Sequence, residues 1–366
     1  MVGDGDFARR SMDQTVNTNT RLHDLRPLVE PLLAEAGMGG PFQLDALPSG
    51  GNNRVYRVEC DGGTAILKHY FCHPDDPRNR LAAEFGFSQF AWAAGVRRLP
   101  RPLACDPLHS LGLYEWISGR KLGAGDVTTS HVLEAVAFFR EINRNTIAGA
   151  DLPIASEACF SMAEHLACVD RRLESLLTID ATRPTGRQTA DLISSRMLPL
   201  WKHIRAKVLA EVVSTGLPLH EPLPDLERCI TPSDFGFHNA LLADGSPASG
   251  ALRFIDFEYS GWDDPAKTVC DFFCQPAVPV PREHLEAFID AAEAMSPLSN
   301  RLRDRVALLL PVYELKWCCI MLNEFLPVGE IRRSFALTAD DHEVRQARQL
   351  QKVDAAVTRL RVQSGA

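Results

Sequence analysis

One stretch, residues 230 to 259, constrains the fold of this chain more than any other. It reads ITPSDFGFHNALLADGSPASGALRFIDFEY. Asn239 precedes a short apolar run, a loop rich in Gly, Pro and Ser follows, and a second apolar run leads directly into Asp256. Two short apolar runs joined by turn residues are typical of a β-hairpin. We therefore expect a hairpin with a polar side chain at each end, and Asp234 in the turn before it.

These three side chains suit phosphoryl transfer. Mg²⁺ prefers oxygen ligands and keeps waters and nucleotide phosphates in its remaining positions, so Asn239 and Asp256 can suffice to hold it. Asp234 could then orient an acceptor hydroxyl and accept its proton. The order and spacing match the kinase pattern D-x-x-x-x-N followed by a metal-binding Asp. The alternative is structural, because Asp and Asn often cap turns and end strands.

At these residues the chain resembles the aminoglycoside phosphotransferase family, relatives of choline kinases. That family shows H-x-D-x-x-x-x-N, then I-D-F/W-E, then G-x-x-D-P, and this chain has PSDFGFHN, IDFEYSGW and DDP. Pro232 stands where the family has His, and Thr268 where it has an acid. Both missing groups brace the catalytic loop in the family. Asp271, one helical turn further on, could supply the missing support.

The first 120 residues predict a small sheet and two helices. Residues 20 to 38 have a helical period, residues 42 to 70 alternate like a hairpin, and residues 80 to 94 are again helical. Lys68 lies near the end of a strand, where a buried Lys normally needs an anionic partner. Glu84 is the first acid of the following helix, and in kinases such a Glu aims the strand Lys at the phosphates. Taken alone, both could be surface charges.

The resemblance extends to the turn SGGNNRVY, which is similar to the glycine turn of the family and has Asn53 in its Asn position. Backbone N–H groups of Ser49, Gly50 and Gly51 could approach phosphate oxygens there, although a plain turn would look the same. We expect residues 96 to 101 to return to the sheet and a strand within residues 108 to 122. In the family this strand leads into the hinge, where main-chain groups of Glu115 and Ile117 would hydrogen-bond the nucleotide base.

The rest of the chain is predicted to be mainly helical. The helices are expected at 132–144, 162–177, 190–213, 282–295, 300–326 and 340–361, with a loop at 183–186. In the family, substrate recognition comes from C-lobe helices and the loop after the metal-binding Asp. The candidates here are acids and aromatics, although each could equally be a surface acid or a core ring: Glu258, Tyr259, Trp262, Asp263, Glu314, Trp317 and Glu324.

Composition adds limits on partners and location. The net charge of −8 is carried mainly by residues 121–366, and this acidic distal part argues against a nucleic-acid partner and is compatible with a cationic small substrate. No apolar segment follows the N-terminus, and charged residues interrupt the apolar residues 306 to 322, so we expect neither a signal peptide nor a membrane partner. The ten cysteines contain no C-x-x-C pair. They favour buried thiols in a reducing cytoplasm over a metal site at 270, 274, 318 and 319.

Together these features predict an α+β, protein-kinase-like fold of two lobes, with a β-sheet N-lobe at 19–118, a helical C-lobe at 119–366 and disorder at 1–18. The resemblance implies an Mg²⁺-dependent kinase that uses ATP or GTP. Its acceptor would be the hydroxyl of an aminoglycoside-, amino sugar- or choline-like substrate. Two alternatives remain: a nucleotide-binding pseudokinase with a regulatory or scaffolding role, and an interaction protein without nucleotide. The oligomeric state stays open.

Overall fold

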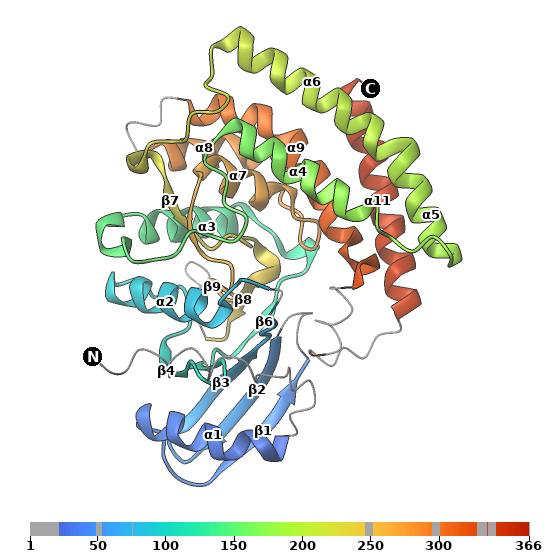
Figure 1. Cartoon of the computed structure of the whole chain (residues 1–366). Coiled ribbons are helices and arrows are strands. Elements are labelled where there is room, and N and C mark those ends of the chain that lie inside the picture. The colour runs from blue at the N-terminus through green and yellow to red at the C-terminus, as the bar shows by residue number, and fades with distance from the viewer. Residues whose placement is uncertain are drawn as a thin grey trace, which may run out of the picture.

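A computed structural model describes residues 22–48, 53–74, 76–245, 252–294, 301–327, 335 and 342–365 of this chain. It has a small antiparallel sheet at one end and a larger, mainly helical part at the other, as Figure 1 shows. This confirms the predicted two-lobed α+β architecture. The predicted disorder at 1–18 and the predicted glycine turn of Ser49, Gly50 and Gly51 lie outside the described residues.

The N-lobe sheet has five antiparallel strands in the order β1-β2-β3-β5-β4. Their bounds are β1 Phe42–Leu47, β2 Asn53–Cys60, β3 Gly63–Tyr70, β4 Pro102–Asp106 and β5 Leu111–Glu115. Helix α1, Leu22–Glu35, packs its apolar face on this sheet, where Leu25, Val29 and Leu32 meet Val58 and Leu67. Alternating strand residues and the helical period of α1 thus bury one common face.

The expected return to the sheet at residues 96–101 comes later than predicted: Arg101 contacts the sheet by hydrogen bonds to Glu115, and strand β4 begins at Pro102. Val96 and Leu99 are buried, and they belong to the core of the helical lobe rather than to the sheet. The apolar residues of this connection therefore pack against the helical lobe and take no part in strand pairing. Helix α2, Arg80–Ala93, lies between the two lobes. Its Phe85 packs on Tyr114 of the sheet, and its Phe87 packs on Phe257 of the helical lobe.

The C-lobe is built around helix α9, Leu302–Leu322, which packs against α4, α7 and α11 (Figure 1). The other helices are α3 Thr129–Ile142, α4 Met162–Leu176, α5 Pro184–Leu192, α6 Leu198–Thr215, α7 Pro265–Cys274, α8 Leu285–Glu293 and α11 His342–Ser364. The expected loop at 183–186 was wrong, because Pro184 occupies the first turn of α5, where its missing N–H has no cost. A π-helical segment, Ile193–Met197, joins α5 to α6.

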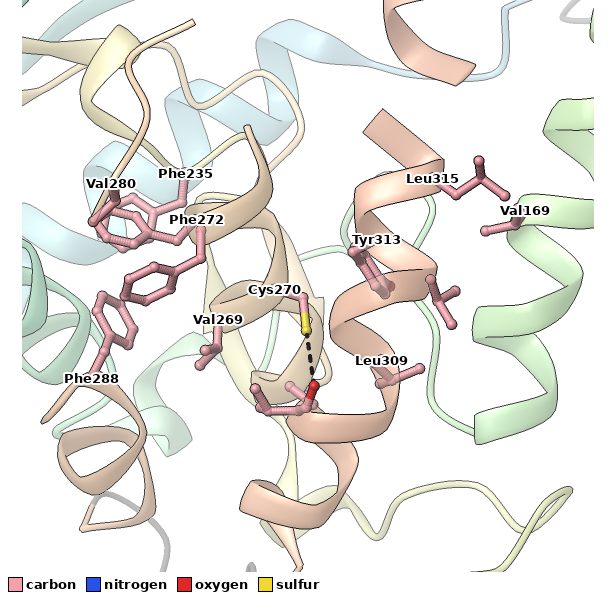
Figure 2. Packing of buried hydrophobic residues seen from close by; sticks show 14 of the residues in the cluster. Val169, Phe235, Val269, Cys270, Phe272, Val280, Phe288, Leu309, Tyr313 and Leu315 are labelled. Carbon is pink, nitrogen blue, oxygen red and sulfur yellow. Dashed lines mark hydrogen bonds between the residues drawn. The ribbon is translucent and has the colours of Figure 1, made fainter. Parts of the chain in front are cut away.

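Helix α9 and the turn after it, Leu302–Phe325, form the one described helix that is long and apolar enough to cross a membrane. However, 56% of its most apolar window is buried inside the protein. Figure 2 shows Leu309, Tyr313 and Leu315 of this helix pointing into the C-lobe core. The composition of α9 is therefore that of a core helix.

Aromatic rings fill the other side of this core. Figure 2 shows Phe235, Phe272 and Phe288 in contact, with ring centroids 4.9 Å apart for Phe235 and Phe272 and 4.8 Å for Phe272 and Phe288. Cys270 is fully buried beside them, with its thiol 3.9 Å from the Val306 carbonyl oxygen. Because Phe235 directly follows Asp234, this cluster fixes the segment that carries the predicted base.

The predicted hairpin is confirmed. It consists of β8, Ala240–Ala243, and β9, Leu252–Phe254, which pair antiparallel with Ala240 opposite Phe254. Strand β6, Gly119–Lys121, lies on the other edge of β8. The strands β7, Cys229–Thr231, and β10, Gly261–Asp263, were not predicted; they pair with each other and frame the segment on both sides.

Candidate active site

The hairpin register brings its two polar ends together. The backbone N–H of Ile255 donates to the Asn239 carbonyl oxygen at 2.9 Å, so Asp256 begins just beyond the pairing with Asn239. Asp256 has φ = 71°, a left-handed conformation that few residues other than Gly adopt and that Asp tolerates better than most. Such backbone conformations cluster at functional sites, where the surroundings hold them in place.

Lys68 joins this hairpin to the N-lobe. Its Nζ lies 2.7 Å from Glu84 Oε1 and 2.9 Å from Asp256 Oδ1. Burial would lower the pKa of Lys68, but the two carboxylates outweigh it and raise the pKa above its usual value. Strand β3, helix α2 and the segment after β9 therefore bring three predicted site residues to one point.

Two tyrosines that sequence reasoning missed support Glu84. The Tyr70 hydroxyl lies 2.8 Å from Glu84 Oε2 and 2.8 Å from the Tyr114 hydroxyl. Burial is the main reason that the pKa of Glu84 is raised, and Lys68 opposes this shift. Tyr70 lies two residues after Lys68 on β3, so strand periodicity places both side chains on one face. That periodicity was a usable signal.

The carboxylate of Asp234 is held by its own loop. Asn239 donates from Nδ2 to the Asp234 carbonyl oxygen at 3.0 Å and to its Oδ2 at 3.2 Å, and His238 Nε2 lies 3.2 Å from Oδ1. Burial alone would raise the pKa of Asp234, but hydrogen bonds from His238 and Asn239 lower it below its usual value. The side chain remains 31% exposed, so the charged group is accessible. Phe235 and Phe237 on either side of Gly236 are buried and anchor the loop.

A chain of hydroxyls braces this loop where the family motif has His and an acid. Thr268 donates from Oγ1 to Thr231 Oγ1 at 2.9 Å, and Thr231 Oγ1 accepts the Ser233 backbone N–H at 3.0 Å. Thr231 ends β7 just before the loop, Ser233 begins the loop with φ = 65°, and Thr268 reaches them from α7. Asp271 does not take over this role, since its carboxylate binds Lys316 instead, with both oxygens 3.0 Å from Nζ.

Asn53 connects the lobes through its side chain. It donates from Nδ2 to Glu258 Oε2 at 2.9 Å, and Arg80 Nε lies 3.2 Å from the same oxygen. Burial and the nearby Asp256 charge raise the pKa of Glu258 to about 7, although Arg80 and Asn53 oppose this. Because the Asn53 side chain is hydrogen-bonded to Glu258, Asn53 would affect nucleotide binding by holding the two lobes together.

The predicted hinge follows β5. The Glu115 N–H already donates to the Arg101 carbonyl oxygen at 2.9 Å, and a Glu115 carboxylate oxygen accepts the Arg101 N–H at 3.0 Å. Glu115 would therefore offer a nucleotide base its carbonyl rather than its N–H. Ile117 lies beyond the end of the strand and is half-buried.

A cavity of about 270 Å³ opens beside Asp234. Its lining comes from loops of both lobes and from α4, α7 and α9: Arg78, Ser156, Glu157, Arg172, Ser233, Asp234, Tyr259, Lys267, Asp271, Lys316, Trp317, Ile320 and Asn323. Of the substrate candidates, only Tyr259 and Trp317 belong to this lining. The charged lining residues of α4 and α9 were missed, although Lys316 interrupts a mainly apolar stretch of α9 and could have drawn attention to this site.

The other substrate candidates are engaged elsewhere. Glu314 pairs with Arg282 and Glu324 with Arg345, both away from this cavity. The Trp262 indole N–H donates to the Gly149 carbonyl oxygen, and Asp263 is fully buried. Their positions give them structural roles.

The donor set at the hairpin fits Mg²⁺. Asp256 is 36% exposed on its side chain, and Asn239, with Nδ2 committed to Asp234, presents its amide oxygen as the remaining polar atom. Within the described part of the chain no three His, Cys, Asp or Glu residues gather as a metal site. A cation that takes two protein oxygens and completes its sphere with water and phosphate therefore suits these residues better than one that needs a full protein cage.

Several solved structures have a similar fold. A choline/ethanolamine kinase family protein from Mesorhizobium loti is 20% identical, with a TM-score of 0.53 over 90% of this chain and 94% of that one. An ethanolamine kinase of Plasmodium vivax is 12% identical, with a TM-score of 0.55 over 92% and 90%. Spectinomycin phosphotransferase, solved with ADP and spectinomycin, is 12% identical, with a TM-score of 0.53 over 90% and 98%. These likenesses show the fold.

Among curated proteins, none matches the sequence significantly. The sequence profile of the phosphotransferase enzyme family, by contrast, matches residues 43–309, which span both lobes and every described residue of the predicted site. This chain belongs to the phosphotransferase enzyme family.

Proposed function

We propose that this chain is an Mg²⁺-dependent kinase that transfers the γ-phosphoryl group of ATP or GTP to a hydroxyl of a small polar molecule. The observation that carries the proposal is the junction of Lys68 with Glu84 and Asp256, at 2.7 and 2.9 Å. It lies at the meeting point of the two lobes, and Asp234, which accepts a hydrogen bond from Asn239, lines the cavity described above. A nucleotide site and an acceptor site can therefore share one reaction centre.

Asp234 would act as the base. Its carboxylate is charged and oriented by His238 and Asn239, and it can accept the proton of an acceptor hydroxyl placed in the cavity. The acceptor oxygen then bonds to the γ-phosphorus while the bond to the β-phosphate oxygen breaks. Because phosphoryl transfer needs little covalent chemistry from the protein, positioning of this kind supplies much of the catalysis.

Lys68 would bind phosphate oxygens, with Glu84 fixing its direction. Asp256 and Asn239 would hold Mg²⁺, which neutralises charge on the nucleotide phosphates when bound. Two structures of similar fold contain nucleotides: the spectinomycin phosphotransferase has ADP, and an aminoglycoside phosphotransferase with streptomycin has ATP. The predicted phosphate contacts of Ser49, Gly50 and Gly51 and the base contacts of Glu115 and Ile117 belong to the same proposal.

The first acceptors to test are those that the family implies: aminoglycosides, amino sugars and choline-like alcohols. We expect the protein to act on them in the cytoplasm. Relatives of similar fold include proteins solved with spectinomycin and with gentamicin. The modest cavity volume of about 270 Å³ suits small members of these classes, because clefts for drug-sized ligands usually span about 300–1,000 Å³.

Thermal stability with and without Mg²⁺-ATP tests the nucleotide site. A ligand that binds only the folded protein stabilises it by about 2.7 kcal/mol at a concentration of 100 Kd. We expect a clear rise in Tm for the parent and little rise for Asp256→Ala. Asp234→Asn should keep the rise and lose most ATP consumption, by about 10²- to 10⁴-fold, because only the base is removed.

The same two variants separate the alternatives. A nucleotide-dependent rise in Tm without ATP consumption by the parent, across the acceptor panel, would favour the pseudokinase. The absence of any rise with ATP and with GTP at millimolar concentration would contradict a nucleotide site and favour an interaction protein.

A further inference from the structure

The cavity beside Asp234 has an unusual charge pattern for a site that binds a cationic acceptor. Its lining includes four basic residues and only three acids. One of these acids is Asp234, which is needed for the hydroxyl. The question is whether the other two acids, Glu157 and Asp271, could receive an ammonium group.

Both acids are already paired by cations of the same lining. Arg172 donates from Nη2 to Glu157 Oε2. Lys316 Nζ is 3.0 Å from both oxygens of Asp271, and Lys267 Nζ lies 3.7 Å from one of them. An incoming ammonium would have to compete with these cations, so this cavity offers it no uncompensated carboxylate besides the base.

The aromatic lining residues also already contact charged groups of the protein itself. The guanidinium of Arg78 lies 5.7 Å from the Tyr259 ring centroid, and that of Arg80 lies 5.9 Å from it. The Trp317 indole N–H donates to Asp271 at 2.9 Å. A ring that already faces two guanidiniums is a poor partner for a further cation, because like charges would then share one surface.

One basic residue of the lining, in contrast, keeps an unsatisfied donor. Arg172 Nε is buried and has no hydrogen-bond partner within the described residues, although its guanidinium carries five N–H donors. Arg78 shares the carboxylate of Asp76, at 2.6 Å, with Arg80, at 2.7 Å, and Arg80 pairs with Glu258 as well. Buried donors without acceptors are costly, and an oxyanion from a ligand would satisfy them.

From these contacts we propose that the acceptor of this enzyme carries an oxyanion, a carboxylate or a phosphate, beside the hydroxyl that receives the phosphoryl group. This inference rests on the proposed kinase function and names its substrate class. Arg172 binds the oxyanion, supported by Arg78, a lining residue whose side chain is 35% exposed. Asp234 then meets the hydroxyl within the same cavity of about 270 Å³.

A matched set of four three-carbon polyols tests the charge preference. Glycerol is neutral, glycerate carries a carboxylate, glycerol 3-phosphate carries a phosphate, and 3-amino-1,2-propanediol carries an ammonium. We would measure binding of each by calorimetry and by Tm, with and without Mg²⁺-ATP, followed by ATP consumption. We expect one of the two anionic diols to bind at least about tenfold more tightly than glycerol and the amino diol, as a charge-assisted hydrogen bond implies. Which of the two binds identifies the oxyanion.

Variants locate the effect. Arg172→Gln should remove the preference, whereas Arg171→Gln, one residue away on the exposed side of α4, should leave it unchanged. Glu157→Gln releases Arg172 from its partner and should tighten anion binding, a gain that a misfolded variant cannot imitate. All three should keep the Tm rise with Mg²⁺-ATP, since none touches Lys68 or Asp256.

Equal binding of all four polyols, tighter binding of the amino diol, or an anion preference that survives Arg172→Gln would overturn the inference. Because anion binding is measured without nucleotide as well, it fails independently of the kinase proposal. Loss of the nucleotide-dependent Tm rise in the parent would instead contradict the kinase function itself.

Discussion

Phe235 allows the position of the predicted base to be tested apart from its chemistry. Its ring is 2% exposed and packs among Phe254, Phe272 and other rings, with the nearest centroid, that of Phe272, 4.9 Å away. Asp234 precedes it directly in the chain. We expect Phe235→Ala to let this loop shift and thereby misplace the Asp234 carboxylate.

The size of the effect follows from the packing. Removing a buried Phe side chain costs about 3–5 kcal/mol, a large part of the roughly 5–15 kcal/mol that stabilises a typical domain. A displacement of about 1 Å at a reacting group can reduce the rate by about 10²-fold. We therefore expect kcat to fall by about ten- to a hundredfold, with little change in nucleotide binding, because Lys68 and Asp256 lie on other elements.

Phe139→Ala is the matched control. Phe139 is 1% exposed in the same cluster, with its ring centroid 6.1 Å from that of Phe288, but it lies on α3 and not on the loop. Both variants should lose similar unfolding free energy in denaturant titrations, and only Phe235→Ala should lose most of kcat. Equal losses of kcat in the two variants would refute the reasoning. Phe235→Leu provides a milder change if the Ala variant does not fold.

Three further predictions follow from buried polar groups. Thr268→Val should reduce unfolding free energy by about 1–3 kcal/mol and lower kcat, because the Thr231 hydroxyl loses its donor; an unchanged kcat would argue against the brace. Lys68→Met should weaken ATP binding in calorimetry and destabilise the fold by about 3–5 kcal/mol, since Glu84 is left buried without its cation, and Lys68→Met/Glu84→Gln should recover part of that stability. Burial opposes charge on Asp264, but a buried arginine and histidine hold its pKa at about 2, below its ordinary 3.8. A lowered pKa means that this stability is present above about pH 4 and is lost as the pH falls towards 2, so acid titration of Asp264→Asn should lack a loss of about 2 kcal/mol.

The sequence alone determined the order of the chemistry and the local elements that carry it. Asn239 and Asp256 flank a hairpin whose turn residues are visible in the sequence, and the register then places them together. Lys68 on a strand and Glu84 on the next helix are likewise local features, and the ion pair between them was predictable because a buried Lys needs an anion. Motifs of this kind can be recognised in the sequence because each depends on a few neighbouring residues.

Only the tertiary structure decided how distant groups share a site. The Thr268 brace depends on α7 meeting β7. The acidic composition of the whole chain was compatible with a cationic substrate and gave no sign of the basic residues that line the cavity. Arg172 and Lys316 come from helices far apart in the sequence, with no motif between them. Net charge sums over the entire surface, whereas a ligand feels the few groups that packing places within a Debye length and inside a low-dielectric cavity. The packing of distant side chains therefore determines which acceptor the proposed site would prefer, whereas the local motifs already indicate phosphoryl transfer.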